Sequence, residues 1–139
     1  MSLNYFAVDT DSAINSSNYN YLAYSFSSVE GYSLVSSYQG QNRFVYCGFR
    51  PRFLLIKSAT TTEHWAIYDT ERSRFNHADD VIKANSSDDE DFNYGSGEID
   101  ILSNGFKLRG NWGAINHSSA PTYVFLAIAE KPFKYARAR

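Results

Sequence analysis

Short alternating segments, separated by Gly, Pro and Asn, constrain the fold of this chain more than any other feature of its sequence. No segment longer than about eight residues repeats its apolar side chains with the helical period of 3.6. Several segments instead alternate with the period of two that is typical of strands. The 17% share of aromatic residues also favours strands, because flat rings pack well on a pleated surface. We therefore expect an all-β chain, an antiparallel β-sandwich of jelly-roll type with about nine or ten short strands.

The residues between these segments predict where strands begin and end. Proline cannot donate a hydrogen bond to a sheet, so Pro51 should open a strand. The continuous apolar run Phe53–Ile56 indicates that this strand is buried on both faces. Asn104 and Gly105 form the pair most typical of a hairpin turn. The main expected strands are Tyr19–Ser28, Tyr32–Tyr38, Arg43–Cys47, Phe53–Ile56, His64–Asp69, Glu98–Leu102, Phe106–Arg109 and Thr122–Ala129, with a short strand or turn at Val81–Ala84.

The chain has the length of one domain, at 139 residues. Residues 1–18 are mostly polar and rich in Ser, Asn and Asp, which predicts an N-terminal loop segment. Residues 19–139 are expected to form a single β-sandwich module. The one cysteine, Cys47, lies in an apolar run, so we expect a small buried residue and no internal disulfide bond.

Charge and hydropathy argue against two classes of partner. The formal net charge is -2 and no long basic stretch occurs, so we expect no nucleic-acid binding. The longest unbroken apolar stretch, Tyr123–Ala129, has seven residues, whereas a membrane-spanning helix needs about 20. We therefore expect no membrane insertion.

The sequence lacks the usual motifs of nucleophilic catalysis and of metal binding. It has no G-x-S-x-G elbow, no C-x-x-C and no H-E-x-x-H, and its histidines, His64, His77 and His117, lie far apart along the chain. The acidic run Asp88–Asp91 lacks the alternating ligands and the glycine of a calcium loop, so we interpret it as a solvated loop. We expect no enzyme activity, no cofactor and no metal site.

A glycan-degrading enzyme stays open as an alternative, because glycoside hydrolysis needs two carboxylates that face each other across a cleft. Glu98, Asp100 and Glu130 lie in or beside expected strands, where burial could raise a carboxyl pKa. Alternation also explains Glu98 and Asp100 as the solvent side of a half-buried strand. The sequence does not place the three side chains together.

One loop has the composition of a sugar-binding site. Aromatic rings stack on pyranose rings, and neighbouring amides bond the sugar hydroxyls. Asn111, Trp112, Asn116 and His117 fit this pattern, and Tyr94 in the preceding polar loop is a further such residue. The alternative is that Trp112 caps the hydrophobic core and touches no ligand.

Four separated motifs follow one another along the chain: Phe44–Lys57, Trp65–Arg72, Asp100–Arg109 and Tyr123–Pro132. The first joins Gly-Phe and Pro to an apolar run that ends in Lys, and the second is a W-x-hydrophobic-Y-D strand. The third is a hairpin that leads into Gly-Phe, and the fourth is an apolar strand that ends in A-E-x-P. Together they resemble a β module near the ends of tail-fibre and other virion proteins of tailed bacteriophages.

The resemblance implies a structural role in the virion, in a tail fibre or receptor-binding protein of the phage tail that assembles in the host cytoplasm. It also implies self-association as a homo-oligomer, a trimer being usual for fibres, and contact with other virion proteins. Exposed loops would then meet a host-surface glycan. A capsid or head-decoration protein is the alternative within the virion.

Overall fold

The computed structural model describes residues 5–41, 44–90 and 95–131, in which the chain forms eight strands and two one-turn helices. All strand pairs are antiparallel, which confirms the predicted fold class. No helix in the described ranges is long and apolar enough to cross a membrane. The elements are α1 (Ser12–Asn15), β1 (Ser33–Gln39), β2 (Phe44–Tyr46), β3 (Pro51–Ser58), β4 (Trp65–Asp69), β5 (Ile82–Lys83), β6 (Ile99–Leu102), β7 (Gly105–Leu108), α2 (Gly113–Asn116) and β8 (Thr122–Ala129).

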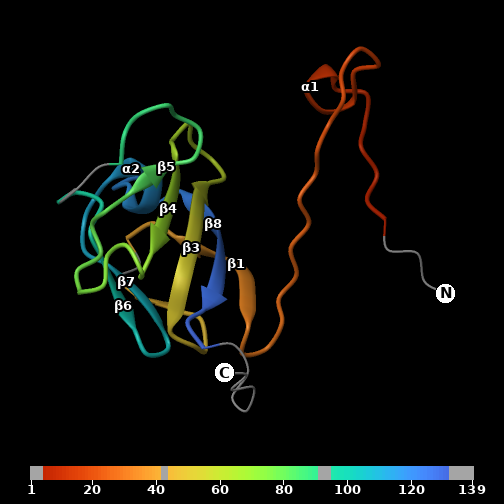
Figure 1. Cartoon of the computed structure of the whole chain (residues 1–139). Helices are drawn as coiled ribbons and strands as arrows, with labels where there is room; N and C mark the ends of the chain where they lie inside the picture. The colour runs from red at the N-terminus through yellow and green to blue at the C-terminus, as the bar shows by residue number, and fades with distance from the viewer. Residues whose placement is uncertain (1–4, 42–43, 91–94, 132–139) are drawn as a thin grey trace.

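The strands form two sheets that pack face to face (Figure 1). The larger sheet has the order β1-β8-β3-β4-β5, and the smaller sheet has the order β2-β7-β6. Leu54 and Ile56 from β3 meet Phe106 from β7 between the sheets, and all three side chains are fully buried. The structure is therefore the expected sandwich, with five strands on one side of the core and three on the other.

Aromatic rings fill the centre of this core. Tyr38 of β1 stacks on Tyr123 of β8 with ring centroids 5.0 Å apart, and it meets Phe106 edge-on at 5.9 Å. Phe106 also meets Phe125 of β8 edge-on at 5.5 Å. Because Phe106 belongs to the smaller sheet and the other rings to the larger one, the cluster holds the two sheets together.

Several predicted boundaries agree with the structure. β3 begins at Pro51, and β8 covers the whole expected segment Thr122–Ala129. The predicted hairpin joins β6 to β7, with Leu102 opposite Gly105. Cys47 is buried and its thiol is free, as its apolar surroundings indicated.

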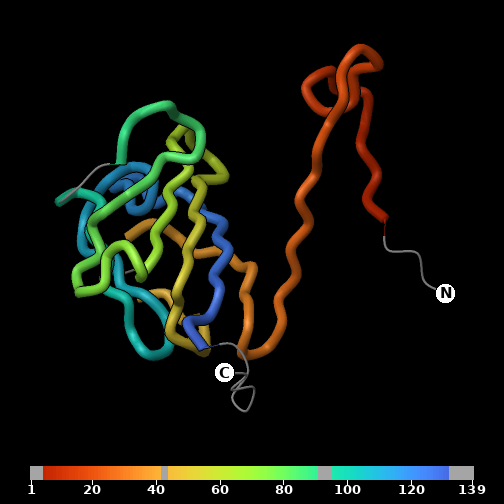
Figure 2. The backbone as a smooth tube through the Cα atoms, viewed as in Figure 1, coloured from red at the N-terminus to blue at the C-terminus, as the bar shows by residue number. Residues whose placement is uncertain are grey.

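The prediction of a strand at Tyr19–Ser28 is wrong. This segment belongs to an N-terminal arm, residues 5–28, which leaves the sandwich beside β1 and extends away from it (Figures 1 and 2). The arm is attached at the β1 edge, where the Ser33 hydroxyl donates to the Ser27 carbonyl at 2.8 Å. A strand needs a ladder partner, and the described residues provide none for this segment. For this reason the alternation does not produce a strand within one chain.

The far end of the arm has a small structure of its own. Asp11 caps α1 by accepting a hydrogen bond from the Ala13 N–H. The Tyr21 hydroxyl donates to the Ser12 carbonyl at 3.0 Å and accepts from the Ser16 N–H at 2.9 Å. The arm therefore ends in a folded-back tip, which is held by its own contacts.

Candidate functional site

The outer face of the larger sheet, which points away from the smaller sheet, carries a row of aliphatic side chains. The strand register places Val35, Leu126, Leu55, Ile67 and Ile82 side by side across β1, β8, β3, β4 and β5. A sheet face in contact with water is normally polar. The row therefore makes this face a candidate binding surface, although Leu126 at its centre is already buried in the single chain.

The pattern of β3 shows how the sequence produces this face. Leu54 and Ile56 point into the core and are fully buried, whereas Phe53 and Leu55 point outward and are only half-buried. The run Phe53–Ile56 predicts a strand that is covered on both faces. In the single chain the inner face is covered completely and the outer face only in part.

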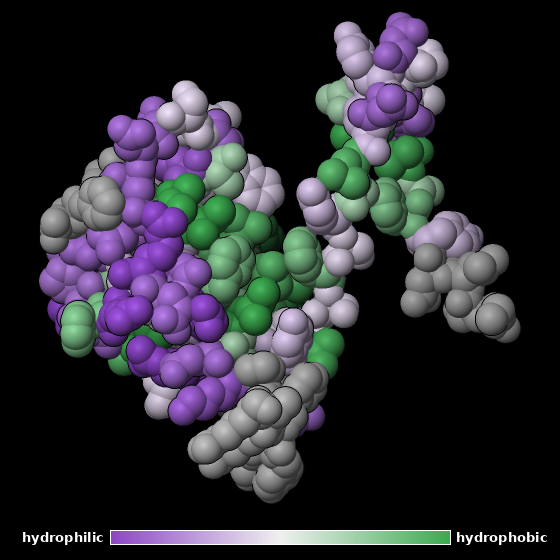
Figure 3. Space-filling model, in the orientation of Figure 1, coloured by the Kyte–Doolittle hydropathy of each residue, from purple (hydrophilic) through white to green (hydrophobic). Residues whose placement is uncertain are grey.

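An open groove of about 380 Å³ lies between the outer face and the N-terminal arm. Tyr24 and Phe26 of the arm form one wall, and Val35, Trp65 and Val124 belong to the sheet wall. Figure 3 shows that the sandwich turns an apolar surface toward the arm. A lining of this kind favours apolar or aromatic side chains over charged ligands.

Lys57 is the charged member of the groove lining. Its Nζ donates to the Ser58 carbonyl at 2.9 Å and to the Thr61 carbonyl at 3.3 Å. The ammonium group is therefore held by the β3–β4 connection, and the methylene stem contributes to the apolar lining.

Sequence reasoning did not identify this face as a site. Two signals in the sequence point to it. The first is the continuous apolar run Phe53–Ile56, and the second is the segment Tyr19–Ser28, which carries rings on both of its alternating sides. Both patterns predict that their side chains are buried, whereas the rest of the described chain covers them only in part.

The loop that was predicted to bind sugar contains α2. Trp112 is half-buried and packs against the core, with its ring near that of His64 at a centroid distance of 6.4 Å. Asn111 and His117 are exposed. Tyr94 lies outside the described residues.

The amide of Asn116 holds this loop to its neighbours. Its Oδ1 accepts from the Gln41 N–H at 2.6 Å, and its Nδ2 donates to the Gly110 carbonyl at 2.8 Å. The ring Nδ1 of His117 lies 2.7 Å from the Ser119 hydroxyl. Asn111, Trp112, Asn116 and His117 therefore lie in one loop, in which the Asn116 amide is used for internal hydrogen bonds.

Two buried tyrosines fix the same loop from below. The Tyr38 hydroxyl donates to the Ile115 carbonyl at 2.8 Å. The Tyr123 hydroxyl donates to the Gly113 carbonyl at 2.6 Å and accepts from the His117 N–H at 2.9 Å. Burial raises the pKa of both phenols, so both remain protonated hydrogen-bond donors at neutral pH.

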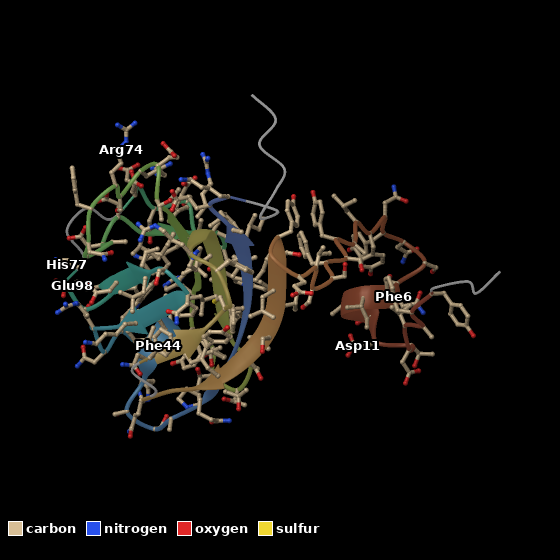
Figure 4. All side chains as sticks on the ribbon, turned by 90° about the horizontal axis from the view of Figure 1, so that it is seen from below. Phe6, Asp11, Phe44, Arg74, His77 and Glu98 are labelled. Atoms are coloured by element: carbon tan, nitrogen blue, oxygen red, sulfur yellow. The ribbon has the colours of Figure 1, made fainter. Side chains whose placement is uncertain are left out.

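The three carboxylates considered for glycoside hydrolysis each lie beside a basic side chain: Glu98 with His77 at 3.2 Å, Asp100 with Arg109 at 2.7 Å, and Glu130 with Arg50 at 2.6 Å. The hydrogen bond to Asp100 raises the pKa of the Arg109 guanidinium. Figure 4 labels His77 and Glu98 on the side of the sandwich away from the arm. Glu98 and Asp100 are two residues apart at β6 and so point to the same side, whereas Glu130 follows β8.

The acidic run lies beside basic neighbours. Lys83 Nζ donates to the Asp88 carboxylate at 3.4 Å, and Arg72 Nε donates to Glu90 at 2.6 Å. Asp91 lies outside the described residues. Within the described ranges, no group of three or more His, Cys, Asp or Glu side chains is arranged to hold a metal ion.

A family model matches residues 1–132 of the chain, which include both the arm and the sandwich. The chain belongs to the DUF7483 family, which is described as a domain of unknown function. No curated protein and no solved structure matches the chain. The family match therefore covers the arm and the sandwich together.

Proposed function

We propose that this chain is a structural module of a tailed-bacteriophage virion, in a tail fibre or receptor-binding protein of the phage tail. It works by assembling with copies of itself, with a trimer as the expected form, and with other virion proteins. It catalyses no reaction. The four sequence motifs support the placement in a virion, and the apolar outer face of the larger sheet supports assembly as the mode of action.

The uncovered apolar surface is the observation that carries this proposal. Val35, Trp65 and Val124 on the outer face are 43%, 39% and 43% exposed. Nine of the seventeen large apolar side chains that are exposed in the described chain lie in the arm. Broad apolar surfaces of this kind mark protein–protein contacts, because leaving them in water is unfavourable.

Purified phage particles provide the direct test. The proposal expects peptides of this chain in the particles and immunogold label at the end of the tail. Label on the capsid would favour the alternative of a head-decoration protein. Particles that lack the chain would refute the virion role.

Contact with a host glycan is a separate part of the proposal. It rests on the loop that presents exposed Asn111 beside half-buried Trp112. The test is a glycan array probed with the wild type and with Asn111→Ala, which leaves the core untouched. We expect binding that weakens in the variant, whereas an array without signal would remove glycan contact from the proposal.

The glycan-degrading alternative is tested with host polysaccharide. Release of new reducing ends by the wild type, lost in Asp100→Asn or Glu98→Gln, would replace the structural proposal with a catalytic one. We expect no release above the buffer control.

A further inference from the structure

We propose that the apolar outer face of the larger sheet receives the N-terminal arm of a second copy of this chain, so that the copies are joined by exchanged arms. This inference rests on the proposed self-association and specifies its interface. Within the described ranges, the arm and the outer face carry twelve of the seventeen exposed large apolar side chains, and every copy has both surfaces.

The first step is the extent of the outer face. Its central row is aliphatic from Val35 on the edge strand β1 to Ile82 on the opposite edge strand β5. The neighbouring row contains Val124 and Trp65, and the Lys57 ammonium between them is held by backbone carbonyls. The face therefore offers a continuous aliphatic row, flanked by Lys57 on β3 and by Asp69 at the end of β4.

The second step is the character of the arm. Residues 12–29 contain no Asp, Glu, Lys or Arg, which is unusual for a segment exposed to water. Tyr19, Leu22, Tyr24 and Phe26 are 71%, 76%, 77% and 57% exposed. The segment also has the alternation of a strand, yet it has no ladder partner among the described residues. Both properties indicate a segment that becomes buried through contact with another molecule.

The third step is the path of the arm. Near its attachment, Tyr24 and Phe26 reach their own sheet and form the outer wall of the groove. Beyond this point the arm continues away from the sandwich, and Figure 4 places the labelled Phe6 and Asp11 far from it. The arm therefore frames its own groove without filling it. A second apolar segment can enter between the two walls.

A second copy matches this groove in chemistry and in area. Four large side chains of the arm beyond Tyr24, among them Tyr19 and Leu22, would bury on the order of 150 Å² each, and the face would bury a similar area. Two exchanged arms would then bury roughly 2,400 Å² in total, which is in the range of stable protein–protein interfaces. Because each copy gives one arm and receives one, an exchange that closes in a symmetric ring leaves neither surface open.

The first test compares the mass of the full-length protein with that of three variants by sedimentation velocity. Leu22→Ser changes the arm, which lies outside the core, and Val124→Glu places a charge on the outer face. Phe75→Ser is the matched control, because Phe75 is an exposed ring (85%) outside both surfaces. We expect an oligomeric wild type, association that is weakened about tenfold or more in each of the first two variants, and no change in the control. A monomeric wild type, or an oligomer that neither variant weakens, overturns the proposal.

The second test asks which molecule fills the groove. One chain carries Leu22→Cys, a differently tagged chain carries Val124→Cys, and both carry Cys47→Ala. After mixing, a bifunctional maleimide should join the two different chains. A third chain carries both new cysteines and shows whether the arm instead reaches its own sheet. An oligomer without the cross-link between chains, or a cross-link that forms only within this third chain, overturns arm exchange. Detection of the chain in phage particles is independent of either result, so the virion role can survive the loss of this interface.

Discussion

Replacing Tyr123 with Phe should destabilise the protein about as much as the same change at Tyr38, although the two hydroxyls make different numbers of hydrogen bonds. The Tyr123 hydroxyl makes two hydrogen bonds, one to the Gly113 carbonyl and one from the His117 N–H. The Tyr38 hydroxyl makes one, to the Ile115 carbonyl. Phenylalanine keeps each ring in place and removes only these bonds.

The magnitude follows from the number of bonds and from the burial of the groups left behind. A net hydrogen bond contributes about 1 kcal/mol, and a buried partner that stays unpaired adds to the loss. His117 is exposed and Gly113 is half-buried, so water can replace part of what Tyr123 loses. Ile115 is fully buried, so its carbonyl would stay unpaired after Tyr38→Phe. We expect a loss of about 2 kcal/mol for each variant, from two partly solvated hydrogen bonds at Tyr123 and from one fully buried hydrogen bond at Tyr38. For a chain of this size a loss of this magnitude lowers the Tm by about 8 °C.

The assay is urea unfolding followed by far-ultraviolet circular dichroism, at one fixed protein concentration because association would shift the apparent stability. Tyr46→Phe is the control, since Tyr46 is 65% exposed and its loss of a hydroxyl should change the free energy of unfolding by less than about 0.5 kcal/mol. If Tyr123→Phe unfolds at the same urea concentration as Tyr46→Phe, the two hydrogen bonds do not hold the α2 loop. If Tyr38→Phe unfolds at the same urea concentration as Tyr46→Phe, the reasoning from the buried Ile115 carbonyl is wrong.

Three further predictions concern packing and protonation. Gly110→Ala should destabilise the protein by about 3 kcal/mol or more in the same urea assay, because the added Cβ would lie 1.8 Å from the Ser96 carbonyl oxygen. Gly95→Ala is the control and should be nearly neutral, because its Cβ would have its nearest neighbour at 3.6 Å. Burial raises the pKa of Cys47 from 9.0 to about 12 and that of Tyr38 well above 10.0. The unfolded chain therefore loses these protons at a lower pH than the folded chain, so the urea midpoint should stay constant below pH 9 and fall as the pH rises above 9. A midpoint that stays constant up to pH 11 would contradict this. The same burial predicts that a thiol reagent labels Cys47 slowly in the native protein and at once in urea, and equal rates would show that the thiol is accessible.

The strands of the sandwich could be predicted because their signals are local. Pro51 opens β3 because proline cannot donate to a ladder, and Thr122–Ala129 is apolar enough to lie at the centre of a sheet. The hairpin at Asn104 and Gly105 was also found, although the glycine has another reason to be there. Gly105 starts β7 opposite Tyr46, and a Cβ at this position would lie 2.1 Å from the Val45 carbonyl oxygen. The sequence marks the turn, but it does not show the neighbouring strand that requires a glycine.

The contacts of the sugar-binding candidate could not be predicted, because its partners lie far away in sequence. The Asn116 amide accepts from the N–H of Gln41, which lies 75 residues earlier in the chain. An Asn beside a Trp has the same composition whether its amide faces solvent or a neighbouring loop. Only the pairing of β1 with β8, which brings Gln39 opposite Thr122, places these two turns together.

The arm and the outer face show a different limit of sequence reasoning. The alternation in Tyr19–Ser28 indicates a segment suited to a half-buried strand, but it does not indicate which molecule supplies the neighbouring strand. The run Phe53–Ile56 likewise reports burial on two sides, and the described chain supplies one side fully. Both patterns depart from the single-chain structure in the same direction, toward more burial. If the partner is a second copy, the arm of one chain covers the outer face of the other, and both segments become buried as their patterns predict. The sequence then describes the assembled protein more closely than the isolated chain.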